Sequence, residues 1–142
     1  MDYHIDVQKE VGELRGVFPQ ISQSDFYELD NDNVGVIVYY SPNDSDFTTF
    51  KILIEYTPGY PSSPPKAWVM NPEISSSTPH TYGTDSNGHV RICFIKPSNW
   101  SSDLTSYDAA VMIKTWVYAY CNYKKNGSWD WDEEGFLGHL LP

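Results

Sequence analysis

The chain has 142 residues, 40% of them hydrophobic, which is enough for one domain with a buried core and too few for two domains of ordinary size. Its formal net charge of −10 disfavours binding to nucleic acid and to anionic membranes, so protein partners are expected. Two widely spaced cysteines suggest no disulfide framework, and no apolar run approaches the ~18 residues that cross a bilayer. We therefore expect residues 1–142 to form a single domain of a soluble protein in a reducing cytoplasm.

The first predicted elements are an amphipathic helix and a β-hairpin. Apolar residues recur at near-helical spacing from about Tyr3 to Gly16, and Pro19 ends the pattern. Two runs rich in aromatic and β-branched residues follow, Phe26–Asp30 and Val34–Tyr40, separated by an Asn-Asp-Asn connection. This arrangement predicts two antiparallel strands that begin a sheet.

The strongest strand pattern covers Phe50–Tyr56. Every second residue, from Phe50 to Tyr56, is apolar and points to one face, whereas the residues between them, Lys51, Leu53 and Glu55, point to the other face. The next stretch, Tyr56–Pro65, contains four prolines, which fix φ and remove backbone donors. It predicts a stiff turn rather than a paired strand. A short strand, Lys66–Met70, is expected after it.

The segment Pro79–Trp100 places Cys93 after a turn-rich approach, between His80 and Trp100. Its Gly, Asn, Asp and Ser residues cannot continue a helix or a central strand, so the chain is expected to cross the surface just before Val90. This predicts an exposed Cys93 thiol at a loop-to-strand edge. A cysteine is often only a core residue, but the flanking glycines and nearby histidines favour a chemical role.

A long helix is predicted after Trp100. Thr105 followed by Asp108 resembles a capping box at its start, and Asn126-Gly127 supplies the stop. Apolar residues form a continuous stripe along it, which predicts packing on the sheet. Cys121 lies on this stripe, so we interpret it as a core residue rather than a second catalytic thiol. The stripe consists of Ala109, Met112, Ile113, Trp116, Val117, Tyr120 and Cys121.

The order of these motifs resembles the ubiquitin-conjugating (E2) family over almost the whole chain. Gly59–Lys66 resembles the proline signature of that family, Pro79–Tyr82 its histidine-proline-asparagine box, and Ile92-Cys93 its thioester site. The resemblance implies an α+β UBC fold with an N-terminal helix, a four-stranded antiparallel meander, an active-site loop and a long packing helix. It also implies a thioester transferase that uses Cys93 as its nucleophile.

Two departures from the family pattern indicate a subgroup. Thr81 and Tyr82 stand where the family has Pro and Asn, and the stretch from His80 to Cys93 is a few residues longer than in eukaryotic members. After the long helix the chain carries Asn126-Gly127-Ser128-Trp129. These variants are similar to the bacterial E2-like proteins of antiphage (CBASS-type) defence operons. The resemblance implies an E1-like activating protein as a partner, with a cyclic-oligonucleotide synthase (a cGAS-like nucleotidyltransferase) or a ubiquitin-like protein as cargo. The chain has no P-loop or other adenylate-forming signature, so we expect the activator to be a separate chain, and no cofactor is expected.

A thiolate attacks an activated carbonyl far better than a hydroxyl does at neutral pH, and the thioester stores energy for a later transfer. Cys93 is the expected carrier. The donors considered for the oxyanion are the Tyr82 hydroxyl, a backbone N–H near Cys93, and Asn99. For His80 two roles remain open: orienting the loop through hydrogen bonds, which we favour, or acting as a general base.

Other functions fit the sequence less well. A papain-like protease needs a cysteine that opens a helix and a longer chain with two lobes. The four histidines and two cysteines form no C-x-x-C or H-x-x-x-H pair, so no metal site is expected. The serious alternative is a non-catalytic E2 variant that only binds partners. Such variants typically lack the cysteine that this chain keeps.

Overall fold

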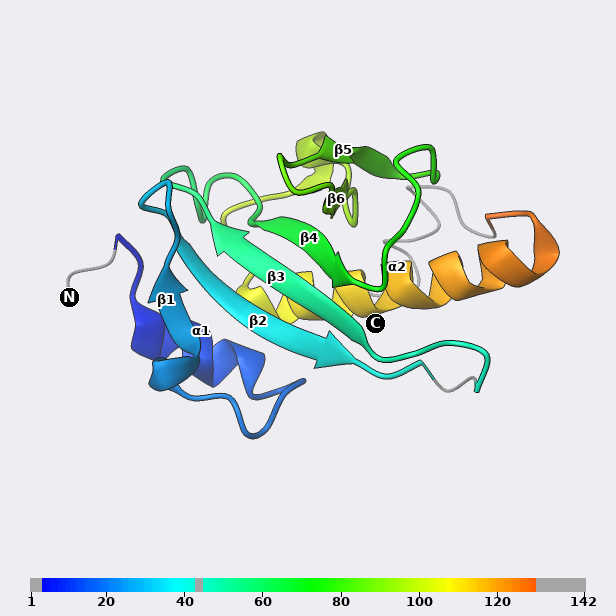
Figure 1. Cartoon of the computed structure of the whole chain (residues 1–142). Helices are drawn as coiled ribbons and strands as arrows, with labels where there is room; N and C mark the ends of the chain where they lie inside the picture. The colour runs from blue at the N-terminus through cyan, green and yellow to red at the C-terminus, as the bar shows by residue number, and fades with distance from the viewer. Residues whose placement is uncertain (1–3, 43–44, 130–142) are drawn as a thin grey trace.

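The computed structural model of the protein describes residues 4–42 and 45–129. One antiparallel sheet of six strands, in the order β1-β2-β3-β4-β6-β5, packs with two α-helices in this part of the chain (Figure 1). The predicted α+β class is confirmed. The expected four-stranded antiparallel meander is present as β1 to β4, and β6 and β5 extend the sheet beyond β4. The elements are α1 (Val7–Leu14), β1 (Phe26–Glu28), β2 (Val34–Tyr40), β3 (Phe50–Tyr56), β4 (Lys66–Asn71), β5 (Thr81–Thr84), β6 (Val90–Ile92) and α2 (Ser106–Asn126), with short 3-10 turns at Gln23–Asp25 and Pro97–Asn99.

The centre of the sheet has one face made of apolar cross-strand neighbours. Val36 lies opposite Ile54, and Ile54 lies opposite Ala67, so one layer of side chains crosses β2, β3 and β4. All three side chains are at most 1% exposed. The alternation along β3 therefore predicts its core face correctly, and this face forms the floor of the hydrophobic core.

Helix α2 crosses this face of the sheet, behind the strands in Figure 1. Its start is fixed by a capping box between Thr105 and Asp108, and its end by Gly127, whose φ of 77° lies in the left-handed region that glycine adopts at low cost. Every member of the predicted apolar stripe is buried, including Cys121, which confirms its place in the core. Neither α2 nor α1, the two α-helices in the described ranges, is long and apolar enough to cross a membrane.

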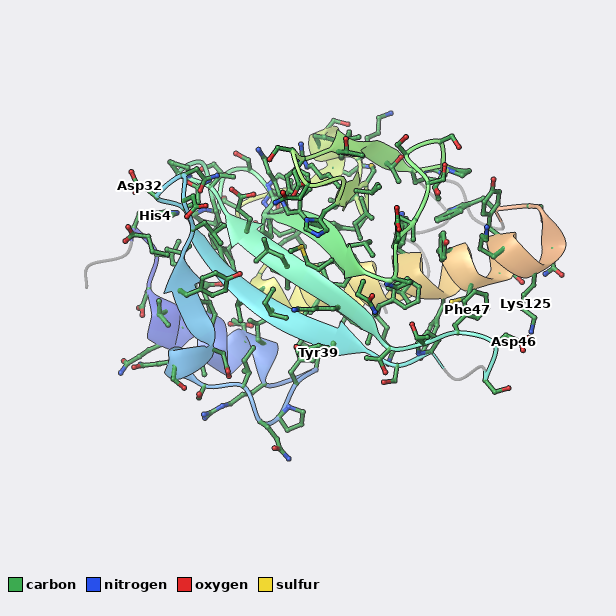
Figure 2. All side chains as sticks on the ribbon, in the orientation of Figure 1. His4, Asp32, Tyr39, Asp46, Phe47 and Lys125 are labelled. Atoms are coloured by element: carbon green, nitrogen blue, oxygen red, sulfur yellow. The ribbon has the colours of Figure 1, made fainter. Side chains whose placement is uncertain are left out.

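The far end of α2 carries an ion pair with the connection between β2 and β3. Figure 2 shows Lys125 and Asp46 close together, and the Lys125 Nζ lies 3.8 Å from an Asp46 carboxylate oxygen. Both side chains are about half exposed or more, at 48% and 72%. Because such solvated pairs contribute at most about 1 kcal/mol, the buried stripe rather than this pair holds α2 in place.

Helix α1 is shorter than the sequence predicts and is attached to α2 by a buried polar cluster. It begins after Asp6, whose side chain caps it by accepting from the Lys9 N–H at 3.3 Å. Tyr3, where the predicted helix starts, lies outside the described residues. The Glu10 carboxylate, 3% exposed, accepts hydrogen bonds from Ser106 Oγ at 2.5 Å and from the Tyr60 hydroxyl at 2.6 Å. Burial and this carboxylate raise the pKa of Tyr60 above its ordinary value. The cluster joins α1, the proline-rich loop and the start of α2.

A second buried carboxylate, Glu55, holds the β1–β2 hairpin. The hairpin forms as predicted, but β1 ends at Glu28, earlier than expected. Glu55 lies on the opposite face of β3 and accepts hydrogen bonds from the side-chain nitrogens of Asn31 at 2.8 Å, Asn33 at 2.7 Å and Trp68 at 2.9 Å. Burial on its own would raise the pKa of Glu55, but these three donors and nearby Lys66 lower it below its ordinary value of 4.5.

We expect ionised Glu55 to increase the free energy of unfolding, and this contribution to be lost at low pH. A carboxyl whose pKa is lower in the folded state adds stability that is present above its unfolded pKa and is lost as the pH falls through the folded value. Glu55→Gln is therefore expected to lower the free energy of unfolding at pH 7 and to flatten its decline below about pH 5. Urea unfolding at several pH values measures both effects. Glu28→Gln, at an exposed carboxylate of β1, is the control, and an unchanged acid dependence in Glu55→Gln would contradict the prediction.

Candidate thiol site

Cys93 immediately follows β6 and is enclosed rather than exposed. Its side chain is 9% exposed, so the predicted exposed thiol is wrong. The physical reason is that the next two residues, Phe94 and Ile95, are 3% and 5% exposed and belong to the core, which draws the cysteine inward. Its backbone N–H donates to the His80 carbonyl oxygen at 2.8 Å, and this bond fixes the cysteine against the start of β5.

The Tyr82 side chain contacts the sulfur. Its hydroxyl lies 3.0 Å from Cys93 Sγ and donates a hydrogen bond to it, while the thiol itself faces the Ile95 carbonyl oxygen at 3.4 Å. A donor aimed at sulfur stabilises the thiolate, which is the nucleophilic form. Tyr82 is also 48% exposed, so the sulfur and its donor lie at the boundary between the interior and solvent.

The backbone of β5 explains how Tyr82 reaches the sulfur. The pairing of β5 with β6 shifts in register between Thr81 and Gly83, which leaves Tyr82 within an irregularity of the ladder. Gly83 has a φ of 137°, a conformation that side-chain-bearing residues rarely adopt. Irregularities of this kind bend a strand and redirect a side chain, and here the redirected side chain is Tyr82.

His80 contributes its backbone to the site. Its φ of 58° is in the left-handed region, unusual for a residue other than glycine. Its carbonyl oxygen accepts from the Cys93 N–H and from Trp116 Nε1 at 3.0 Å, and its ring lies 5.0 Å from that of Trp129. His80 thus connects the cysteine loop to α2, an arrangement that suits the loop-orienting role we favoured for it.

Of the other expected oxyanion donors, the N–H of Cys93 itself donates to His80, while Asn99 ends the 3-10 turn Pro97–Asn99. Trp100 follows this turn, and its Nε1 donates to the Pro61 carbonyl oxygen at 2.8 Å. The proline-rich loop is therefore attached to the segment that follows the cysteine. Of the three candidates, the Tyr82 hydroxyl is the one whose hydrogen bond to the sulfur is recorded.

The family model of the Type II CBASS E2 proteins matches residues 10–136 of this chain. The chain belongs to this family. No curated protein matches it. The match begins at Glu10 within α1 and takes in the whole sheet, the cysteine loop and α2, so the elements that surround Cys93 all lie inside it. It bears out the resemblance to the E2-like proteins of antiphage defence operons.

One residue beside the thiol of this CBASS E2 protein, Arg91, was not predicted from the sequence. Arg91 lies in β6, and its guanidinium carbon is 4.5 Å from the centre of the Tyr82 ring. The alternation of buried Val90 and Ile92 around it indicates that Arg91 faces away from the core. That pattern could have marked a cation beside the cysteine, but only the fold shows that it lies over the tyrosine.

The described part of this CBASS E2 protein contains no cluster of metal-ligating side chains. Within residues 4–42 and 45–129, no group of three or more His, Cys, Asp or Glu side chains is placed to hold a metal ion. His89 lies near the tip of the β5–β6 hairpin, with its Nδ1 3.0 Å from the Asp85 carboxylate, which also accepts from the His89 and Asn87 backbone. This pair holds the turn together.

Proposed function

We propose that this CBASS E2 protein is a thioester carrier with a UBC fold, which accepts the activated C-terminus of a cyclic-oligonucleotide synthase on Cys93 and passes it on. An E1-like protein supplies the activated cargo. The observation that carries the proposal is the hydrogen bond from Tyr82 to Cys93 Sγ, because it stabilises the sulfur nucleophile that thioester formation uses. Family membership supplies the antiphage context.

In the proposed reaction the Cys93 thiolate attacks the activated carbonyl carbon of the cargo. A sulfur–carbon bond forms, the carbonyl oxygen becomes negatively charged, and the activating group then leaves with the electron pair of its former bond. The negative charge develops on the former carbonyl oxygen, which is bonded to the carbon that Sγ attacks, and the Tyr82 hydroxyl lies beside that sulfur. That hydroxyl is therefore suited to stabilise first the thiolate and then the oxyanion.

Tyr82→Phe is expected to slow formation of the thioester roughly ten- to a hundredfold, the worth of one hydrogen bond to a charged group. The stability should change by no more than about 1 kcal/mol, because one hydrogen bond of a half-exposed side chain is removed. Single-turnover kinetics and thermal melting separate the two effects. Tyr39→Phe, at another exposed tyrosine, 57% exposed and on β2, is the matched control. Unchanged transfer kinetics in Tyr82→Phe would eliminate this residue as the donor.

Capture of the cargo tests the proposal directly. Cys93→Ser protein purified from the native host is expected to retain the cargo as an ester, which is more stable than a thioester, and Cys93→Ala protein serves as the control. Mass spectrometry should find the C-terminal peptide of a cyclic-oligonucleotide synthase on residue 93. A small β-grasp protein there would instead indicate a ubiquitin-like cargo. No adduct, even with activator and ATP supplied, would leave a non-catalytic binding module.

A further inference from the structure

We propose that Arg91 is a positioning residue, which holds Tyr82 in the orientation from which its hydroxyl reaches Cys93. The role rests on the thioester chemistry proposed above, because it concerns the same sulfur. In this arrangement the Tyr82 hydroxyl donates a hydrogen bond to the Cys93 sulfur, and the Arg91 guanidinium contacts the Tyr82 ring.

Tyr82 is a half-exposed side chain at an irregular position of its strand. Nearly half of the side chain is in solvent, at 48% exposed, and its backbone lies where the register of β5 and β6 shifts. An exposed tyrosine at an irregular strand position has several rotamers open to it, and only some of them bring the hydroxyl to the sulfur. A contact on the face of the ring reduces that freedom.

Arg91 provides this contact from the opposite strand. It is paired with Gly83 in the β5–β6 ladder, so its backbone is fixed next to the residue that follows Tyr82. The guanidinium lies over the ring at 4.5 Å, well within the ~6 Å range over which a cation is attracted to the face of an aromatic ring. A planar guanidinium also stacks on the ring, which an ammonium cannot do.

The arginine is not committed to another polar partner within residues 4–42 and 45–129. Its Nε is buried and has no hydrogen-bond acceptor there, and none of the carboxylates in these ranges forms an ion pair with it. An arginine that served only to neutralise a surface carboxylate would have such a partner. The guanidinium instead interacts with the face of the Tyr82 ring.

The test measures the reactivity of Cys93 without activator or cargo. Purified full-length protein is treated with iodoacetamide at pH 7, and the alkylation rate of the Cys93 peptide is followed by mass spectrometry. Arg91→Gln is expected to slow alkylation about two- to fivefold, the range that corresponds to an exposed cation–π contact. Arg91→Lys, which keeps a cation over the ring, should recover part of the rate. Thermal melting of each variant shows whether it is folded.

The decisive comparison is a double-mutant cycle with Tyr82→Phe, which removes the hydroxyl and keeps the ring. If Arg91 acts through Tyr82, Arg91→Gln should have no further effect once the hydroxyl is absent. An equal slowing in both backgrounds, or none in either, would overturn the proposal. The matched control is Lys114→Gln, which removes the cation 5.9 Å from the Tyr118 ring on α2 and should leave the rate unchanged.

The same cycle separates this inference from the proposed function. If alkylation follows the expected pattern but no adduct forms on Cys93 with activator, ATP and synthase, the positioning role stands and the carrier function fails. If the adduct forms at the same rate in Arg91→Gln as in the unmodified protein and alkylation is unchanged, the carrier function stands and the positioning role fails.

Discussion

Replacing Cys93 with alanine is expected to abolish any reductant-sensitive conjugate formed with activator, ATP and cargo. The reason is the identity of the nucleophile: an alanine methyl group cannot form an acyl bond, whereas a serine hydroxyl can form an ester that survives thiol reductants. Cys93→Ser should therefore convert the conjugate from a reductant-sensitive to a reductant-resistant form. Gel analysis with and without reductant, followed by intact mass measurement, checks both results.

Cys121→Ser is the matched control, because it changes the same atom at the second cysteine. Cys121 is 5% exposed and lies on the buried stripe of α2, where its side chain fills core space. The conjugate should remain in this variant, with some loss of stability from placing a hydroxyl in the core. Loss of the conjugate in Cys121→Ser, with retention in Cys93→Ala, would overturn the assignment of the carrier cysteine.

The largest loss of stability is expected for Trp116→Ala, about 3–5 kcal/mol, which is typical of a fully buried large aromatic residue. Trp116 is 0% exposed and lies at 5.5 Å, between ring centres, from both Tyr120 and Trp129. Its removal would also take one of the two recorded donors from the His80 carbonyl oxygen. Urea unfolding measures the loss, and the alkylation rate of Cys93 reports its effect on the site.

Two further variants separate the causes of the Trp116→Ala effect. Trp116→Phe keeps most of the ring but removes the Nε1–H, so it should cost less and still leave the His80 carbonyl oxygen with a single recorded donor. Tyr118→Ala, on the same helix at a 43% exposed position, should change the stability by less than about 0.5 kcal/mol. A loss in Trp116→Ala no greater than that in Tyr118→Ala would show that the helix does not depend on this contact.

The parts of the fold that were predictable have a local signature. β3 shows a period of two, and α2 has a capping box, a continuous apolar stripe and a glycine stop, so both were located closely from the sequence. β5 and β6 are only four and three residues long, and the turn-forming run Asp85–Gly88 lies between them. Their strand character depends on pairing with β4 and with each other, which leaves too little periodicity within either segment to detect.

The candidate site also has a part that the sequence predicted and a part that only the fold shows. The order of motifs singled out Cys93, His80 and Tyr82, but the contact between the Tyr82 hydroxyl and the sulfur depends on a register shift that no spacing reveals. The enclosure of Cys93 was missed because glycines before it suggested a surface loop, while the apolar residues after it determine its burial. Arg91 and Glu10 were missed for a related reason, since their partners come from other elements.

The bond between Glu10 and Ser106 has a consequence for synthesis of the protein. The two residues are 96 positions apart, so α1 emerges from the ribosome long before its buried partner exists. At translation rates of about 5–20 residues per second, the interval is roughly 5–20 s. The β2–β3 hairpin, whose strands are neighbours in sequence, can form within microseconds of its emergence. We therefore expect the nascent chain to hold a partly formed sheet with an uncovered apolar face until α2 is complete.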